Sequence, residues 1–246
     1  MSVTTGLRRR HAPATGIWVA TAGCWGVLLA LAVTGTGHPG HDDVAGGSAG
    51  LVGMAGFLAG WLTMAGAMML PVMVRPVRHL AEHAPAPGQV PRLVASFAGV
   101  WAAFGLVALA GDAGVHRLVD GWAWLGARPG LVLAGVLLLA GMFRLGALAV
   151  SAGRRRSGSP LPAAADRGSG WRVGLRLGTG SLVCDGPLML LMFAAGAGDL
   201  GLMVTLTAVM LAERDERWGG GVATLTGYVL VAAGVIVAAA VIAPIR

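Results

Sequence analysis

The chain carries few charged residues for its length. Asp, Glu, Lys and Arg together make up 12% of its 246 residues, hydrophobic residues make up 56%, and the mean hydropathy is +0.74. Soluble globular domains carry about 25% charged residues, so this composition excludes an ordinary soluble domain. It predicts an all-α polytopic membrane protein, a helical bundle in which residues 1–246 form a single integral membrane domain.

Lysine is absent, and all 18 basic residues are arginine. The net charge of +7 would suggest nucleic-acid binding if the arginines shared one soluble face. They lie instead in short segments between apolar runs, where basic residues hold loops on the cytoplasmic side of a membrane. We therefore expect the lipid bilayer as a partner and no nucleic acid. The Ala-, Gly- and Arg-rich usage without lysine is typical of a GC-rich bacterial genome, which predicts the bacterial plasma membrane.

Only two cysteines are present, Cys24 and Cys184, and both fall within apolar runs. A disulfide framework would have no purpose there, so we expect two free thiols. The arginine-rich N-terminus followed by an apolar stretch resembles a signal peptide. However, the stretch continues to about residue 34 and no A-x-A cleavage site follows, which predicts a retained first membrane span.

Apolar runs long enough to cross about 30 Å of hydrocarbon recur along the chain. They predict seven helices, at about 17–35, 49–74, 91–111, 130–152, 173–197, 200–213 and 220–243. The sixth is short, and residues 196–199 before it are either a tight outer turn or a break in one longer helical hairpin. Arginine-rich and arginine-poor segments alternate, which places the N-terminus in the cytoplasm and Arg246 outside. Residues 153–171, rich in Pro, Gly and Ser, are predicted to form a flexible cytoplasmic loop.

Glycines four residues apart occur in two of the predicted helices, at Gly56 and Gly60 and at Gly174 and Gly178. Such spacings let helix backbones approach closely within a membrane. We therefore expect both helices to pack in the core of the bundle.

The stretch WLTMAGAMMLP, residues 61–71, concentrates methionine in the second predicted helix. Trp61, Met64 and Met68 recur at i, i+3 and i+7 and share one face, while Met69 is turned about 100° away. Pro71 removes the helical partner of the carbonyl four residues earlier, at Ala67, which is then free to accept a bond from another helix. Two interpretations stay open at this point. The methionines form a stripe of thioether donors, or they fill irregular gaps in the protein core, as methionine often does.

Asp185 lies near the middle of the fifth predicted helix, where an ionised carboxylate costs about 2.5–3.5 kcal/mol to insert. Arg144 in the fourth helix lies at a similar depth, because the two positions differ by only about 6 Å along the helix axes. One interpretation is a buried structural pair between Arg144 and Asp185. The other is that Asp185 is protonated or binds a metal ion together with Cys184 and Met189.

These residues resemble an uncharacterised bacterial family of predicted metal-binding integral membrane proteins. The stretch WLTMAGAMMLP is similar to that family's W-x-x-M-x-x-A-M-M-x-P motif, and VCDGPLMLLMFAAGAGDLGLMVTLTAVMLAER is similar to a later segment that ends in Glu-Lys. The positions that fit in the later segment are Cys184, Leu188, Met189, Phe193, Gly196, Met203 and Glu213. The resemblance covers about the second, fifth and sixth helices and implies an intramembrane metal site.

The chain departs from that family at several donor positions. Ser181, Asp185 and Gly186 stand where the family has Cys, Cys and Trp, and Gly198 and Asp199 stand where it has Met and Asn. The candidate metal ligands that remain are Met64, Met68, Met189, Cys184, Asp185, Asp199 and Met203, with Trp61, Met69, Pro71, Arg144 and Glu213 as further motif or structural positions. Soft thioether and thiolate donors favour Cu(I), so a copper ion is the predicted ligand.

Three functions are compatible with these features. The first is a membrane protein that binds copper for handling, transport or delivery to a client or partner membrane protein. The second is a membrane scaffold or assembly subunit in which a pair between Arg144 and Asp185 only holds helices together. The third, a membrane enzyme, has the least support, because the sequence contains no phosphate-binding loop, no credible Ser-His-Asp set and no histidine-rich intramembrane centre.

Overall fold

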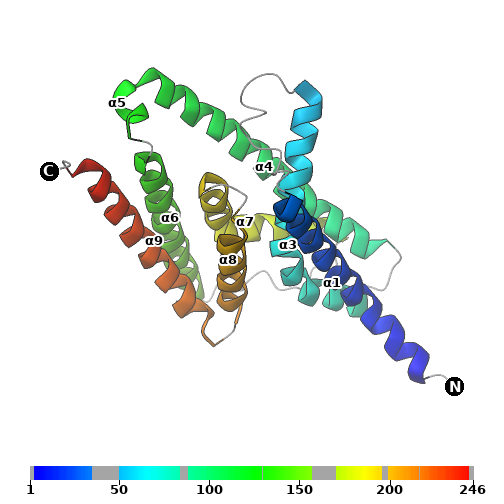
Figure 1. Cartoon of the computed structure of the whole chain (residues 1–246). Coiled ribbons are helices and arrows are strands. Elements are labelled where there is room, and N and C mark those ends of the chain that lie inside the picture. Colours follow the sequence, from blue (N-terminus) through cyan, green and yellow to red (C-terminus); the bar gives the residue numbers. More distant parts are fainter. Residues whose placement is uncertain are drawn as a thin grey trace. The chain divides into compact units, whose positions relative to one another are not determined.

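A computed structural model shows that the chain is helical. It describes residues 3–34, 50–83, 88–128, 130–156, 170–195, 199–215 and 217–243, and within these ranges every regular element is an α-helix. The helices are α1 (Val3–Thr34), α3 (Gly50–His83), α4 (Gln89–Gly121), α5 (Ala123–Gly126), α6 (Gly130–Arg156), α7 (Gly170–Ala195), α8 (Leu200–Glu213) and α9 (Gly219–Ile242) (Figure 1). The predicted all-α class is therefore confirmed.

Each of the seven predicted helices coincides with a helix of the structure, but several are longer than predicted. The helix α1 begins at Val3, α3 continues past two prolines to His83, and α4 continues to Gly121. The sequence-based boundaries were set where polar residues begin, and a helix can continue beyond its apolar part. The first residues of the predicted loop 153–171 are helical too, because α6 extends to Arg156. Residues 157–169 of that loop lie outside the described ranges.

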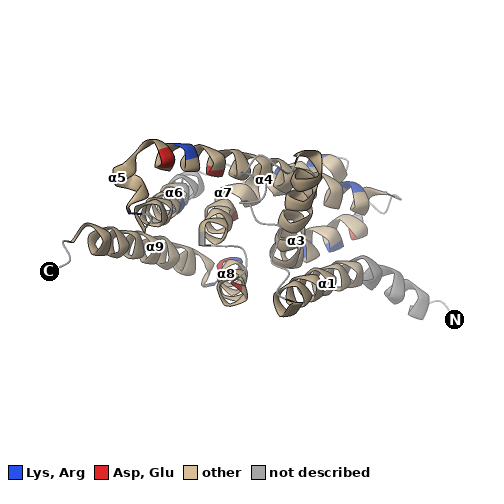
Figure 2. Ribbon diagram, turned by 45° about the horizontal axis from the view of Figure 1, so that its top comes forward, with Lys and Arg blue, Asp and Glu red and all other residues tan. Residues whose placement is uncertain are grey.

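Five helices are long and apolar enough to cross a membrane. These segments are Thr15–Thr34, Gly50–Glu82, Gln89–Gly121, Gly170–Ala194 and Gly219–Ile242. The apolar segments Gly130–Gly146 and Leu200–Glu213 are shorter. By this criterion the described residues contain five spans, fewer than the seven predicted. Charged residues are sparse along these helices, and one group of them lies near the C-terminal end of α4 (Figure 2).

The chain divides into two compact units. The first comprises Met1–Leu109 and Ala164–Gly180, and the second comprises Ala110–Ala163 and Ser181–Arg246. The helices α4 and α7 each contribute residues to both units. The two units are described separately below.

Packing of α1 on α3 organises the first unit. The indole of Trp25 in α1 donates a hydrogen bond to the Ala67 carbonyl at 3.1 Å, which is the oxygen that Pro71 deprives of its helical partner. This confirms that the carbonyl is available to another helix, and α1 is that helix. Cys24, the residue before Trp25, also lies against α3. A Cβ at Gly66 would be 2.9 Å from the Cys24 sulfur.

The two predicted glycine pairs have different outcomes in the first unit. A Cβ at Gly174 in α7 would collide with Ser96 and with the Leu93 carbonyl of α4, and one at Gly178 would lie 2.9 Å from Val100. The prediction of close packing is therefore confirmed for α7. The helix α3 also packs, against α1, but Gly60 does not contribute to this, because its Cβ position has no atom within 4 Å. The spacing alone does not tell which face of a helix meets a neighbour.

The pair α6 and α9 forms the framework of the second unit (Figure 1). A Cβ at Gly141 in α6 would lie 2.7 Å from Val231 and 2.8 Å from the Gly227 carbonyl. On the α9 side, a Cβ at Gly227 would lie 2.7 Å from Leu145, and one at Gly234 would lie 2.8 Å from Leu138. Residue numbers rise along α6 as they fall along α9, so the helices are antiparallel and glycine lets their backbones meet.

Candidate functional site

Most of the methionines are inside the protein. Among the ten that the structure describes, Met54 and Met142 are exposed, at 41% and 64% of their surface, and the other eight are at most 2% exposed. The buried set consists of Met64, Met68, Met69 and Met73 in α3, Met189 and Met192 in α7, and Met203 and Met210 in α8. The α3 methionines belong to the first unit and the other four to the second, so each unit contains four buried thioethers.

Trp61 fixes the methionine face of α3 against α4. Its indole Nε1 donates to the Trp101 carbonyl at 2.8 Å, and the side chain is 3% exposed. Gly105, one turn along α4, makes room for the ring, because a Cβ there would lie 2.6 Å from it. Phe57 and Phe104 pack around the same ring, with centroids 6.1 and 5.9 Å away. Met64 and Met68 follow Trp61 by three and seven residues, so they lie on the face of α3 that this indole turns toward α4.

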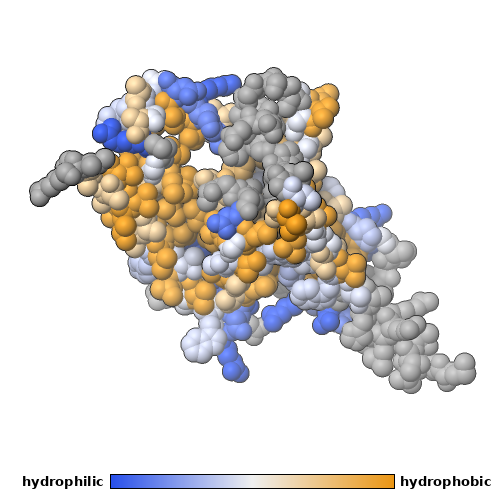
Figure 3. Space-filling view, viewed as in Figure 1, coloured by the Kyte–Doolittle hydropathy of each residue, from blue (hydrophilic) through white to orange (hydrophobic). Residues whose placement is uncertain are grey.

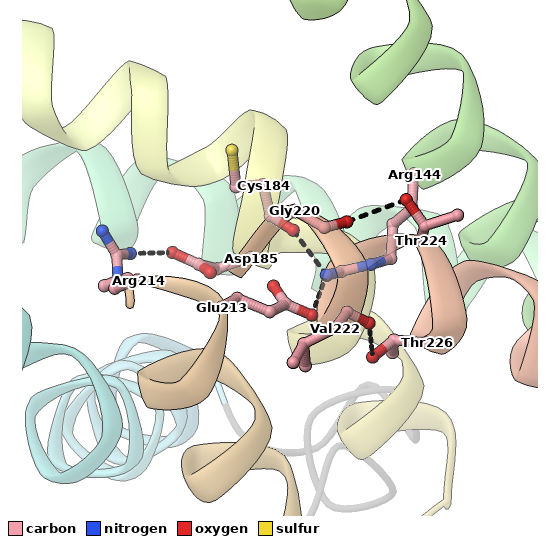
Figure 4. Close-up of polar contacts among 9 residues, drawn as sticks. All are labelled: Arg144, Cys184, Asp185, Glu213, Arg214, Gly220, Val222, Thr224 and Thr226. Carbon is pink, nitrogen blue, oxygen red and sulfur yellow. Dashed lines mark hydrogen bonds and ion pairs between the residues drawn. The ribbon is translucent and has the colours of Figure 1, made fainter. Parts of the chain in front are cut away.

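Four charged side chains meet in the second unit. Arg144 of α6 donates to the Glu213 carboxylate at the end of α8 and to the Cys184 carbonyl of α7, the latter at 2.8 Å (Figure 4). Arg214, the next residue after Glu213, pairs with Asp185 at 2.5 Å. Asp185 also accepts a hydrogen bond from the Ser181 hydroxyl at 2.8 Å. The two positive and two negative charges sum to zero, which is the condition under which buried charges are tolerated.

The predicted direct pair between Arg144 and Asp185 is wrong, because each residue has another partner. The sequence-based argument compared only helices four and five and treated Glu213 as the polar end of a span. The short α8 instead ends beside the middle of α7. There Glu213 pairs with Arg144, and Arg214 pairs with Asp185. The expectation that a buried Asp185 has a cationic partner is confirmed, and the partner is Arg214.

The contact of Arg144 with the backbone of α7 lies next to a proline. Pro187 lies inside α7 and cannot donate to the carbonyl four residues earlier, at Val183. The Arg144 guanidinium donates to the next carbonyl along the helix, that of Cys184. An intramembrane proline is tolerated when neighbouring helices provide such bonds.

The predicted carboxylate and thiol ligands have other roles or positions. Asp199 is the N-cap of α8 and accepts a hydrogen bond from the Leu202 amide at 3.0 Å. Asp185 is engaged by Arg214 and Ser181, and Cys184 is exposed whereas Met189 is fully buried. Among the described residues, no group of three or more His, Cys, Asp or Glu side chains could hold a metal ion. The fully buried sulfur donors among the described residues are thioethers, four in each unit.

Several site residues were missed by the sequence-based argument. Met192 and Met210 are completely buried, yet only their neighbours Met189 and Met203 were among the predicted ligands. The signal was present in the spacing, because Met192 follows Met189 by three residues and Met210 follows Met203 by seven. No spacing could have indicated Trp101, because its role depends on a backbone carbonyl.

Comparison with known proteins identifies the family. No curated protein and no solved structure matches the chain at a significant level. Residues 58–237, about three quarters of the chain, match the family described as PpoB2, copper chaperone. The match begins within α3 just before Trp61 and ends within α9. The chain therefore belongs to the PpoB2 copper chaperone family. This supports the predicted handling of copper.

Proposed function

We propose that this member of the copper chaperone family works within the bacterial plasma membrane, where it holds Cu(I) between buried methionine side chains and delivers it to a client protein. The observation that carries the proposal is the burial of Met64 and Met68 one helical turn apart on the Trp61 face of α3. Cu(I) is a soft ion that prefers sulfur donors, and the family description names copper.

Neutral thioethers suit cargo that must be released. A thiolate adds a negative charge and binds Cu(I) strongly, whereas a thioether leaves the ion with its own single charge. In addition, residues 50–74 of α3, which contain these thioethers, include no charged residue. The proposed ligands are therefore Met64 and Met68 in the first unit. Met189 and Met203, the other thioethers of the predicted set, belong to the second unit.

The surface of the helices supports a membrane location. Apolar side chains such as Val107, Leu139 and Ile236 are 67%, 71% and 67% exposed, as expected for residues that face lipid. Hydrophobic residues also cover much of the visible face of α6 and α9 (Figure 3). With the arginine distribution of the sequence, we infer a multi-pass protein whose N-terminus is cytoplasmic.

Copper binding by paired variants tests the proposal. The Met64→Leu/Met68→Leu protein keeps side-chain volume and apolarity, a change that typically costs under about 1.5 kcal/mol of stability. The purified protein in detergent is loaded with Cu(I) under reducing conditions, dialysed and assayed for copper. Met54→Leu, an exposed methionine of the same helix, is the matched control.

We expect the wild type and Met54→Leu to retain equal amounts of copper and the double variant to retain less, with unchanged thermal stability. A wild-type protein that retains no copper under reducing conditions would contradict the proposal. The scaffold function would then be the better explanation, because the ion pairs of Arg144 and Arg214 would have only a structural role.

A further inference from the structure

The helix α4 is longer than a membrane span requires. It has 33 residues and is about 50 Å long, whereas the hydrocarbon core of a bilayer is about 30 Å thick. Its apolar run ends at Gly111, and the ionisable side chains of this part of the helix follow within residues 112–121 (Figure 2). These last turns of α4 belong to the second unit, and their composition requires a more polar environment than hydrocarbon.

Residues 112–121 have an apolar face and a charged face. The apolar face consists of Val115 and Leu118, which are three residues apart and are 39% and 53% exposed. The charged face consists of Asp112, His116 and Asp120, which recur every four residues, and His116 Nδ1 lies 3.4 Å from Asp112 Oδ2. At about 100° per residue, the centres of the two faces are about 130° apart. An exposed helix with this division is typical of a boundary between water and an apolar phase.

Two exposed tryptophans follow this amphipathic segment. Trp122 comes directly after α4 and Trp124 lies in α5, and they are 63% and 56% exposed. Backbone hydrogen bonds define the turn that carries them, because the Trp122 amide donates to the Val119 carbonyl at 3.2 Å and the Gly126 amide donates to the Trp122 carbonyl at 3.0 Å. Tryptophan is enriched where hydrocarbon meets lipid headgroups, because its ring is apolar and its N–H needs a polar partner.

A cation lies beside these tryptophans. The guanidinium carbon of Arg128 is 4.8 Å from the centre of the Trp124 ring, and its Nη1 donates to the Trp124 carbonyl at 3.5 Å. A guanidinium binds phosphate well, so this pair combines a group for anionic lipid phosphate with a ring for the acyl chains below it. The helix α6 begins two residues later at Gly130, which makes the turn continuous with the helix whose exposed Leu139 is expected to face lipid (Figure 1).

We propose that residues 112–128 lie in the headgroup region of the outer leaflet and bind the phospholipid surface. The apolar face and the two tryptophans contact the upper part of the acyl chains, Arg128 contacts lipid phosphate, and the charged face is in water. This inference rests on the membrane location given under the proposed function, because it needs a bilayer, but it does not depend on copper binding. The end of α4 thus anchors the second unit at the membrane surface.

Spin labelling of the full-length protein tests the proposal. Cys24 and Cys184 are replaced by serine, and one cysteine at a time is introduced on the apolar face, on the charged face or at Ile236, a 67% exposed residue of α9 that is the reference for lipid contact. The variants are Val115→Cys, Leu118→Cys, His116→Cys, Asp120→Cys and Ile236→Cys. Each labelled protein is reconstituted in vesicles of phosphatidylethanolamine and phosphatidylglycerol. Electron paramagnetic resonance then measures collisions of the label with oxygen, which concentrates in lipid, and with a water-soluble nickel complex.

We expect the ratio of oxygen to nickel collisions to be several-fold higher at Val115 and Leu118 than at His116 and Asp120, and highest at Ile236. The charged face is the matched control, because it lies on the same turns of the same helix. All four positions on α4 are exposed, and each face is represented twice, so a variant that fails to fold leaves the comparison in place.

The other outcomes separate this inference from the proposed membrane location. Equal nickel access to both faces, with Ile236 in lipid, would overturn the inference alone, because the end of α4 would then stand in water. Low access of both reagents at Val115 and Leu118 would also overturn it, because protein rather than lipid would then cover the apolar face. Ready access of the nickel complex to Ile236 would contradict the membrane location itself.

Discussion

Arg144 shows how one buried cation joins three helices of the second unit. Its guanidinium lies in α6, contacts the Glu213 carboxylate of α8 and donates to the Cys184 carbonyl of α7, and the residue is 4% exposed. Removing the carboxylate would destabilise the protein, because the buried guanidinium would lose its hydration without the compensating attraction of an ion pair. The pairing therefore determines which substitutions the second unit tolerates.

A double-mutant cycle checks this pairing. Arg144→Met and Glu213→Gln alone should each lower the free energy of unfolding by about 3–5 kcal/mol, whereas the double variant should lose less than the sum. The measurement is reversible unfolding in detergent. The matched cycle of Arg144→Met with Asp185→Asn should show a weaker coupling, because Asp185 has Arg214 as its own partner. Equal coupling in both cycles would contradict the assignment of partners.

At the scale of elements, glycine determines how closely helices approach. Gly141 of α6 meets the backbone of α9, since a Cβ there would lie 2.9 Å from the Val231 amide nitrogen. Gly135 of the same helix has no atom within 4 Å of its Cβ position. These two glycines lie within two turns of each other and differ chiefly in what they face.

Alanine substitution should therefore have opposite effects at the two positions. Gly141→Ala should destabilise the protein by about 1–3 kcal/mol, because the added methyl group forces α6 and α9 apart. Gly135→Ala should be neutral or stabilise by up to about 1 kcal/mol, because alanine is the better helix former. Thermal unfolding of both variants in the same detergent gives the comparison. A stable Gly141→Ala together with a destabilised Gly135→Ala would show that the α6 and α9 packing is wrong.

The short helix α8 was located correctly from the sequence, but its role was not. Its bounds, 200–213, were predicted correctly, because Asp199 and the charges after Leu211 limit the apolar run. Its role was not predicted, because that role depends on α8 ending beside Asp185 of α7, where Glu213 pairs with Arg144 and Arg214 pairs with Asp185. Helix existence follows from local composition, whereas partner choice depends on three-dimensional register.

At the scale of the whole molecule, the fold class and the shared helix face of Met64 and Met68 could be predicted from the sequence. The interactions between helices largely could not. Hydropathy located every long helix, and the spacing of Met64 and Met68 was visible in the sequence. The bonds of Trp25 and Trp61 to carbonyls of other helices were not visible, since a carbonyl carries no sequence signature. The partners of Asp199 and Asp185, the Leu202 amide and Arg214, were not visible either.

The membrane topology belongs to this scale. With the N-terminus in the cytoplasm and all seven apolar helices crossing the membrane, reporter fusions after Arg156 and after Arg246 should report opposite sides. Equal behaviour of the two fusions would mean that one helix does not cross. The short α8, which is 14 residues long and about 21 Å in length, would be that helix.

The central claim is that buried thioethers hold Cu(I), and X-ray absorption at the copper edge tests it most directly. The measurement uses the full-length wild-type protein, loaded with copper and kept reduced. The account predicts a Cu(I) edge and a first coordination shell of sulfur only, because Met64, Met68 and the methionines of α7 and α8 are the buried donors. A shell that contains nitrogen or oxygen ligands from imidazole or carboxylate groups, or a protein that retains no copper, would contradict it.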